Sequence, residues 1–414
     1  MTEPAPGDLL DLDVTGIAHG GVFVARHEGR VVFVADAIPG ERVRARLSDA
    51  SKKAFWRAET VEVLDASPHR RPHVWAEADV HRAPEQRPGG ADLGHIEIGH
   101  QRALKRRVLS EALDRFAGGG MEAPEVEDAG LASEGWRTRT TLHVDRDGRV
   151  GPYAARSHRI VPVTDHPLAT PGVATAARAL AGGSEGEIDL VQPADGDVRR
   201  ILRPTAPRRA RTGRRPQGRP APRRAPEIIE ERVGDRVFRL DDDGFWQVHA
   251  QAAGILDGAV ADLLRDRIDP EALHLDLYGG VGLFAATLGD LGARRIVTVE
   301  SSPRATLHAA ENLRDLGAEA VTARVDRYLA GSDAPTGGVG AVVLDPPRAG
   351  AGREVVEAVA RLDPQAVVYV ACDPVALARD LGTFREQGFA PQGMRAFDLF
   401  PHSHHLESVV LLTR

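Results

Sequence analysis

The sequence is almost free of cysteine, and Cys372 is the only one among 414 residues. A single thiol excludes an intramolecular disulfide and any zinc or iron–sulfur site built from cysteines. No apolar run approaches the roughly 20 residues that a membrane helix needs. The N-terminal stretch "MTEPAPGDLLDLDV" also lacks the basic segment and apolar core of a secretory signal. We therefore expect a soluble, cytoplasmic protein that does not enter a membrane.

An overall excess of positive charge is absent as well, because the formal net charge is -7 and the pI is near 6.2. The basic residues are nevertheless unevenly distributed, and their distribution sets the local field. Residues 203–226 carry nine arginines, no acidic residue and many prolines. That composition cannot pack a core and predicts a basic loop or linker. Such a loop is either a contact for phosphate groups or a solvated linker without a partner.

The pattern of apolar residues divides the chain into three regions. Residues 8–67 show short β-branched runs separated by turn residues, which predicts a small β-barrel. Residues 68–240 are β-rich, contain a helical pattern at 100–117 and include the basic loop. From residue 241 to 414, buried-looking apolar runs alternate with helical segments and end in a predicted antiparallel hairpin. This last pattern predicts an α/β domain with a parallel, doubly wound sheet.

Two of the predicted strands end in residues that suit an adenosine-containing cofactor. The first is followed by a D-x-Y-x-G-x-G turn formed by Asp276, Tyr278, Gly280 and Gly282, where the backbone can approach a ligand closely. The second ends at Glu300, about twenty residues later, a spacing that suits a carboxylate bound to ribose hydroxyls. Because the G-x-G-x-x-G motif of dinucleotide sites is absent, S-adenosylmethionine is favoured over NAD.

Two further strands bring reactive side chains to the same edge of the sheet. One ends in "VVLDPPRAG", with Asp345 before a rigid Pro-Pro turn and Arg348 after it, and the next ends at Cys372. A buried lone cysteine is usually only a small apolar residue. Here, however, a thiolate could add to carbon 6 of a pyrimidine and so activate carbon 5 for methylation, with a base removing the carbon-5 proton afterwards.

These motifs, taken together, resemble those of a known enzyme family. The stretches "FWQVH", "LDLYGGVG", "VLDPPRAG", "ACDP" and "FPHSHHLESVVLL" are similar, in this order, to motifs of the RNA uracil-5 methyltransferases. The N-terminal barrel resembles the TRAM domain of that family, and "WRTRTTLHV" resembles part of its central domain. The resemblance implies a Rossmann-like class I methyltransferase domain at residues 241–414, after an RNA-binding barrel and a β-rich central domain.

The resemblance also assigns roles to individual residues. It implies that Cys372 is the nucleophile and that Glu407 is the base that removes the carbon-5 proton. The residues that it implies for contact with S-adenosylmethionine are Gln247, Tyr278, Glu300, Asp326 and Asp345.

One feature of many family members is missing from this sequence. Those members hold an iron–sulfur cluster through cysteines, and the corresponding positions here are Pro88, Ala91 and His166. We therefore expect no iron–sulfur cluster. Residues 402–405 contain three histidines, but no completing ligand pattern is present, so we expect no metal site.

The sequence thus predicts a monomeric enzyme that makes 5-methyluridine in structured RNA. Transfer RNA and 23S ribosomal RNA are both substrates of the family, and the motifs do not choose between them. Two alternatives stay open: a cytosine-5 methyltransferase acting on RNA or DNA, and a catalytically inactive RNA-binding protein.

Overall fold

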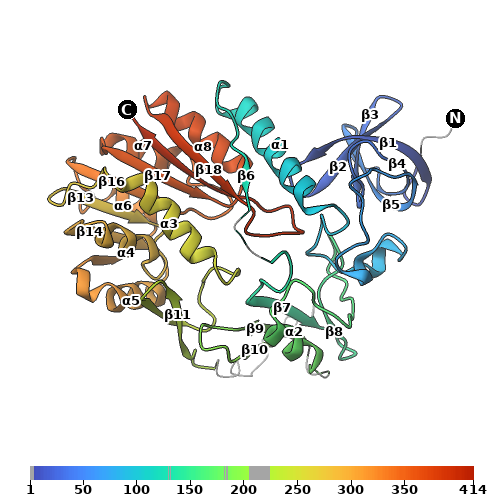
Figure 1. Cartoon of the computed structure of the whole chain (residues 1–414), viewed down its shortest axis with the longest axis horizontal. Coiled ribbons are helices and arrows are strands. Elements are labelled where there is room, and N and C mark those ends of the chain that lie inside the picture. Colours follow the sequence, from blue (N-terminus) through green and yellow to red (C-terminus); the bar gives the residue numbers. More distant parts are fainter. Residues whose placement is uncertain (1–3, 129, 131, 181, 183–184, 205–223) are drawn as a thin grey trace, which may run out of the picture.

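The computed structural model describes residues 4–128, 130, 132–180, 182, 185–204 and 224–414. A small barrel formed by the N-terminal residues lies at one end of the molecule, and a large sheet covered by helices lies at the other (Figure 1). A smaller sheet from the middle of the chain lies beside both. Most of the predicted basic loop, residues 205–223, lies outside the described residues.

The N-terminal barrel is closed by five strands in the order β1-β2-β3-β5-β4. Exposed and buried residues alternate along β1, as expected for a strand with one face in a core. The barrel interior contains the buried side chains of Leu12, Phe23 and Val43, and the barrel predicted from the sequence is confirmed. The strands are β1 (Leu9–Ala18), β2 (Val22–His27), β3 (Arg30–Ala35), β4 (Arg42–Asp49) and β5 (Phe55–Asp65).

The middle of the chain contributes to three different structures. A sheet of order β10-β9-β7-β8 packs against α2, and β11 pairs with β12 in a separate hairpin. The helix α1 and the short strand β6 instead join the large sheet described next. The helices are η1 (Ala76–Ala78), η2 (Pro84–Gln86), α1 (Ile98–Phe116) and α2 (Pro171–Arg178). The strands are β6 (Val126–Glu127), β7 (Arg139–Val144), β8 (Val150–Gly151), β9 (Gly186–Val191), β10 (Arg199–Pro204), β11 (Ile228–Val233) and β12 (Arg236–Asp241).

The large sheet has the strand order β15-β14-β13-β16-β17-β19-β18-β6. The strands from β15 to β17 are parallel, and β19 is antiparallel to both β17 and β18. All residues of β16 and β17 are buried, since helices cover both faces. The predicted α/β fold and its terminal hairpin are confirmed. The strands are β13 (Leu273–Leu277), β14 (Arg295–Glu300), β15 (Glu319–Thr322), β16 (Val339–Leu344), β17 (Ala366–Ala371), β18 (Ala390–Phe397) and β19 (Glu407–Thr413). The helices are α3 (Ala252–Leu264), α4 (Leu283–Asp290), α5 (Pro303–Asn312), η3 (Arg314–Leu316), α6 (Val325–Ala330), α7 (Arg353–Arg361) and α8 (Pro374–Glu386).

Residues 98–127 attach the middle of the chain firmly to the large sheet. The helix α1 packs against α8, and Val126 of β6 pairs with Ala396 of β18. On α1, the buried ammonium of Lys105 lies 2.5 Å from a carboxylate oxygen of Asp398, just beyond β18. A buried pair of this kind fixes the relative position of two elements because separating its members would leave a charge unpaired. The second turn of α1 and the loop after β18 are therefore held together.

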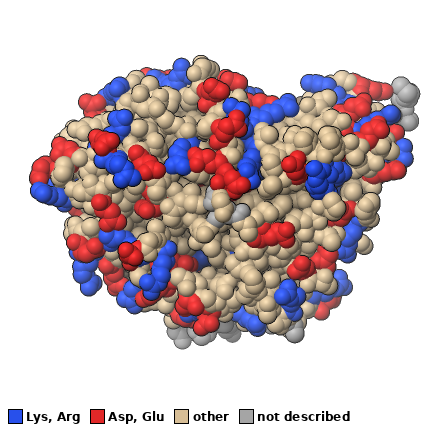
Figure 2. All heavy atoms as spheres, in the orientation of Figure 1, with Lys and Arg blue, Asp and Glu red and all other residues tan. Residues whose placement is uncertain are grey.

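The surface carries charges of both signs. On the face shown in Figure 2, basic and acidic side chains are interspersed around a central area of uncharged residues. Among the helices of the described ranges, none is long and apolar enough to cross a membrane.

Candidate active site

A cleft of about 1450 Å³ opens at the carboxyl ends of β13, β14, β16 and β17. In parallel α/β sheets, ligands bind at this edge. All seven side chains singled out from the sequence line the cleft, although they come from segments up to 160 residues apart. These residues are Gln247, Tyr278, Glu300, Asp326, Asp345, Cys372 and Glu407.

The glycine-rich turn after β13 has a left-handed backbone conformation, which glycine adopts freely and other residues adopt only with strain. Tyr278 has a φ of 66°, and Gly282, the N-cap of α4, has a φ of 96°. A Cβ atom on Gly279 would lie 1.9 Å from the hydroxyl oxygen of Thr298. By contrast, a Cβ atom on Gly280 would meet nothing within 4 Å. The turn is thus tightly packed on its protein side and open on its cleft side, as close contact between backbone and ligand requires.

Asp276 fixes this turn through hydrogen bonds on the side that faces the protein interior. Its Oδ2 accepts hydrogen bonds from the hydroxyl of Thr298 at 2.9 Å and from the backbone N–H of Ala285 at 3.2 Å. The side chain is fully buried, and this burial raises its pKa to about 7. Asp276 therefore connects β13, β14 and α4 rather than facing the cleft.

Glu300 is fixed at the end of β14 by hydrogen bonds to both of its carboxylate oxygens. Its Oε2 accepts from the backbone N–H of Gly280 at 3.2 Å. Its Oε1 accepts from the backbone N–H of Ser302 at 2.7 Å and from the hydroxyl of Ser301 at 3.0 Å. This network joins the glycine-rich turn to the start of α5, so the carboxylate has a defined orientation before any ligand binds.

Asp326 lies on a different part of the cleft wall, in the first turn of α6. Its carboxylate oxygens accept from the guanidinium of Arg324 at 3.0 and 3.1 Å. The hydrogen bond from Arg324 lowers the pKa of this carboxyl group. Asp326 therefore presents a stable negative charge at the cleft.

Cys372, Asp345 and Glu407 lie close enough to influence one another's protonation. Burial, followed by the charges of Glu407 and Asp345, raises the pKa of Cys372 to about 12, whereas Arg348 opposes the change. Burial and Asp345 likewise raise the pKa of Glu407, which is only 5% exposed. Burial raises the pKa of Asp345 to about 7. A site with several acidic groups and little water favours the protonated forms.

The loop that carries Asp345 and Arg348 is anchored by a residue that the sequence analysis did not single out. Asp380 of α8 accepts from the backbone N–H groups of Ala351 and Gly352 and from the hydroxyl of Tyr369. Asp380 is buried, and its ring of donors fixes the loop after β16 against β17 and α8. Its position in the middle of a helical pattern gives no signal of this role.

A second unpredicted residue contributes a positive charge to the cleft. Arg137 lies between Trp136 and the start of β7, and burial lowers the pKa of its guanidinium. Its Nε donates to the carbonyl oxygen of Arg139 at 2.9 Å, and the same cleft also contains Arg348. The stretch "WRTRTTLHV" contains this arginine, but the sequence alone did not show which of its polar residues would face the cleft.

The positions that correspond to cluster cysteines are part of ordinary packing. Ala91 belongs to a buried apolar group with Trp75 and Trp136, and the ring of His166 lies 5.9 Å from that of Trp75. Pro88 forms a bridge with Ala154. Proline, alanine and one histidine cannot replace the thiolates of an iron–sulfur cluster, so these residues do not fit that group. Within the part of the chain that the structure describes, no three His, Cys, Asp or Glu side chains are placed to hold a metal ion.

The cleft does fit an adenosine-containing cofactor. It combines an open glycine backbone, a preoriented carboxylate at Glu300 and room for a small molecule beside Cys372. Among the described residues, the side chains of Gln247 and Asp345 make no hydrogen bond, so their polar atoms can bind a ligand. An ionised or polar group facing a cleft without a protein partner is typical of a binding site.

Comparison with known proteins gives consistent matches along the whole chain. A model of the tRNA (Uracil-5-)-methyltransferase family matches residues 229–414, and a TRAM domain model matches residues 5–61. An RNA methyltransferase of Streptomyces avermitilis is 37% identical, with 98% of each chain covered. The 23S rRNA (uracil(1939)-C(5))-methyltransferase RlmD of Shewanella denitrificans is 28% identical, with 97% of this chain and 95% of that protein covered.

Among solved structures, the tRNA (uracil-54, C5)-methyltransferase of Pyrococcus abyssi, in complex with S-adenosyl-L-homocysteine, has a similar fold. The TM-score is 0.69 at 20% identity, and the match covers 98% of this chain and 100% of that one.

Proposed function

Because the chain belongs to the S-adenosylmethionine-dependent RNA uracil-5 methyltransferases with a TRAM domain, we propose that it methylates carbon 5 of one uridine in a structured RNA. The substrate class that we propose is transfer RNA or 23S ribosomal RNA, in line with the names of the similar proteins. One observation carries the proposal. The cleft at the sheet edge contains a cysteine, a buried carboxylate and a carboxylate-rich ligand site together.

We assign the cofactor to the part of the cleft between the glycine-rich turn and the loop after β16. Glu300 is oriented to accept hydrogen bonds from ribose hydroxyls, and Asp326 and Tyr278 line the adjoining wall. Gln247 and Asp345 line the same cleft, and within the described part of the chain their side chains make no hydrogen bond. When bound, S-adenosylmethionine supplies the electrophilic methyl group that carbon 5 receives.

Cys372 is the proposed nucleophile. In the free protein its thiol is protonated at neutral pH, because its pKa is about 12, so the thiol proton passes to solvent water as the sulfur adds to carbon 6. A sulfur–carbon bond then forms, and the electrons of the C5=C6 double bond move toward the carbonyl oxygen on carbon 4. Carbon 5 thereby becomes nucleophilic. The positive charge of Arg348 favours the thiolate electrostatically and so assists the loss of the thiol proton.

Glu407 is the proposed base for the last step. Its carboxylate takes the proton from carbon 5, the C5=C6 double bond forms again, and the sulfur leaves carbon 6 as a thiolate. Because burial raises its pKa, Glu407 is protonated over a wider pH range than an exposed glutamate. The rate of this step should therefore rise with pH as the carboxylate forms.

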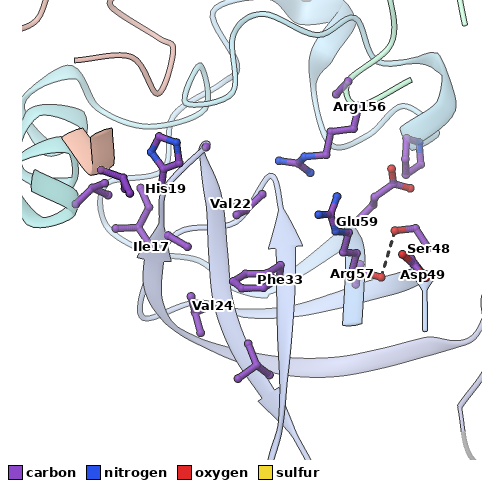
Figure 3. A pocket seen from close by; sticks show the side chains of 18 of the residues that line it. Ile17, His19, Val22, Val24, Phe33, Ser48, Asp49, Arg57, Glu59 and Arg156 are labelled. Atoms are coloured by element: carbon purple, nitrogen blue, oxygen red, sulfur yellow. Dashed lines mark hydrogen bonds between the residues drawn. The ribbon is translucent and has the colours of Figure 1, made fainter. Parts of the chain in front are cut away.

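The geometry favours a nucleotide that has left its stack. A cysteine that is half-buried in a cleft cannot reach carbon 6 of a base inside a duplex, so a single-stranded loop is the easier substrate. Arg57 of the barrel lines the groove shown in Figure 3, and Arg156 approaches from the central region. These cations suit the phosphates of the flanking strand.

Methyl transfer from tritiated S-adenosylmethionine to unmodified transcribed RNA tests the proposal. We expect incorporation into a transfer RNA or a 23S fragment and the recovery of 5-methyluridine after digestion. Cys372→Ala should abolish incorporation while leaving cofactor affinity within about threefold. Label in 5-methylcytosine would contradict the assignment to uridine. Equal incorporation by Cys372→Ala and wild type would contradict the thiol mechanism.

A further inference from the structure

The turn between β1 and β2 of the barrel reaches the edge of the active site. It consists of His19, Gly20 and Gly21, and Figure 3 shows His19 at one side of a groove of about 1090 Å³ between the barrel and α1. The turn is tightly enclosed at Gly21. A Cβ atom there would lie 3.0 Å from the Cβ atoms of both Asp92 and His404. The barrel is therefore packed against the catalytic region at this point.

On one side of the turn, His19 contacts the residue that follows the proposed nucleophile. The Nε2 atom of His19 lies 3.1 Å from Oδ2 of Asp373, whose side chain is 18% exposed. The other oxygen of Asp373 caps α8 by accepting from the backbone N–H groups of Val375 at 3.0 Å and Ala376 at 2.8 Å. One carboxylate oxygen of Asp373 thus caps the N-terminus of α8, and the other contacts His19 of the barrel. Cys372 directly precedes Asp373 in the chain.

On the other side, the turn packs against the loop that leads to the proposed base. Nδ1 of His404 lies 2.7 Å from Oδ2 of Asp92, and the rings of His19 and His404 are 6.4 Å apart in an edge-on arrangement. Glu407 begins β19 only three residues later. The same turn therefore borders the segment of Cys372 and the segment of Glu407.

We propose that His19 is a positioning residue for Cys372, acting through Asp373, so that the barrel contributes to the chemical step as well as to RNA affinity. This inference rests on the proposed function. Small displacements of a reacting group from its productive position reduce rates strongly. An ion pair that fixes the residue next to the nucleophile is thus expected to act on kcat more than on KM.

A purely structural role for Asp373 makes a different prediction. Asparagine caps helices about as well as aspartate, so Asp373→Asn preserves the cap of α8 and removes only the charge that faces His19. If Asp373 merely caps the helix, this variant should be as active as wild type. If His19 acts through Asp373, Asp373→Asn and His19→Gln should have similar effects, and the double variant should be no slower than either single one.

The pH dependence gives a further readout. The hydrogen bond to Asp373 raises the pKa of His19 above its usual value, while burial and Arg379 oppose the shift, and the titratable ring of His404 also faces it. The favourable pairing is therefore complete below pH 6.5 and is lost as the pH rises through the raised pKa. The ratio of wild-type kcat to His19→Gln kcat should be largest below pH 6.5 and should decrease as the pH rises through the raised pKa of His19. Ionisation of Cys372 and Glu407 affects both enzymes and cancels in this ratio.

The experiment uses the full-length enzyme and steady-state methylation of the RNA that wild type modifies. We expect His19→Gln and Asp373→Asn each to lower kcat by about 5- to 20-fold, with KM for RNA within about twofold. His27→Gln, on the same barrel but outside the groove and the cleft, is the matched control and should keep wild-type kcat.

Four outcomes decide the inference. A raised KM with unchanged kcat in His19→Gln would overturn it, since the turn would then serve RNA binding alone. Full activity of Asp373→Asn beside a slow His19→Gln would overturn it too, as would a kcat ratio that does not change with pH. If wild type itself transferred no methyl group to any RNA, the proposed function would fail first, and the two failures are therefore distinguishable.

Discussion

Alkylation of the folded protein with iodoacetamide tests the protonation state of Cys372 directly. Because this is the only cysteine, added mass that peptide mapping locates on Cys372 reports this thiol alone. Burial, Glu407 and Asp345 raise its pKa to about 12, whereas a thiol in an unfolded chain has a pKa of about 8.5. The folded protein should therefore react slowly at neutral pH, and its reaction rate should keep rising well above pH 9.

The size of the effect follows from two opposing factors. At pH 7.5 a thiol with a pKa of about 12 is about 3 × 10⁻⁵ ionised, and one with a pKa of about 8.5 is about 9% ionised, a ratio of about 3000. The more basic thiolate is also the stronger nucleophile, by roughly 40-fold for a shift of this size. Alkylation of the folded protein should then be roughly 80-fold slower than that of the urea-unfolded protein.

Mass spectrometry of samples quenched at successive times, from pH 6.5 to pH 10, provides the assay. Restricted access lowers the rate equally at every pH, whereas a raised pKa keeps the rate rising about tenfold per pH unit up to pH 10. A rate that levels off near pH 8.5 would refute the argument that burial keeps the thiol protonated. At a pH high enough to ionise Glu407, Glu407→Gln should react faster than wild type, because removing that negative charge lowers the pKa of Cys372.

Three other substitutions have expected outcomes. Glu407→Gln should accumulate a methylated protein–RNA adduct that survives denaturing electrophoresis, since it blocks only the last step; release of product at the wild-type rate would contradict this. Gly279→Ala would bring a Cβ atom to 1.9 Å from the hydroxyl oxygen of Thr298, so calorimetry should detect a loss of S-adenosylmethionine binding of at least tenfold. Asp241→Asn removes the carboxylate that pairs with Arg304 and should lower the free energy of unfolding in urea by about 1–3 kcal/mol. Since the hydrogen bond from Arg304 lowers the pKa of Asp241, the difference between the two proteins should vanish as the pH falls through that pKa.

That the candidate site residues lie together could be predicted because each follows a local pattern. Tyr278, Glu300, Asp345 and Cys372 stand at or just beyond the ends of apolar runs, and parallel strands bring such positions to one edge of the sheet. The chemical types of these side chains then limited the kinds of reaction that the site could catalyse, and the motifs around them identified the family. The number of cysteines alone excluded a cluster. None of these inferences required knowledge of which helix packs on which strand.

Contacts between distant parts of the chain could not be predicted in this way. Residues 98–127, in the middle region of the sequence, pack on α8 and extend the large sheet, because burial of the apolar face of α1 depends on the final topology. The pairing of His19 with Asp373 joins residues that are more than 350 positions apart, and no periodicity connects them. The pKa of Cys372 likewise depends on its burial and on the acidic groups that the fold places around it. The sequence by itself determined which groups we propose for the chemistry, and only the tertiary structure decided how those groups are held and protonated, because distances and desolvation arise from packing.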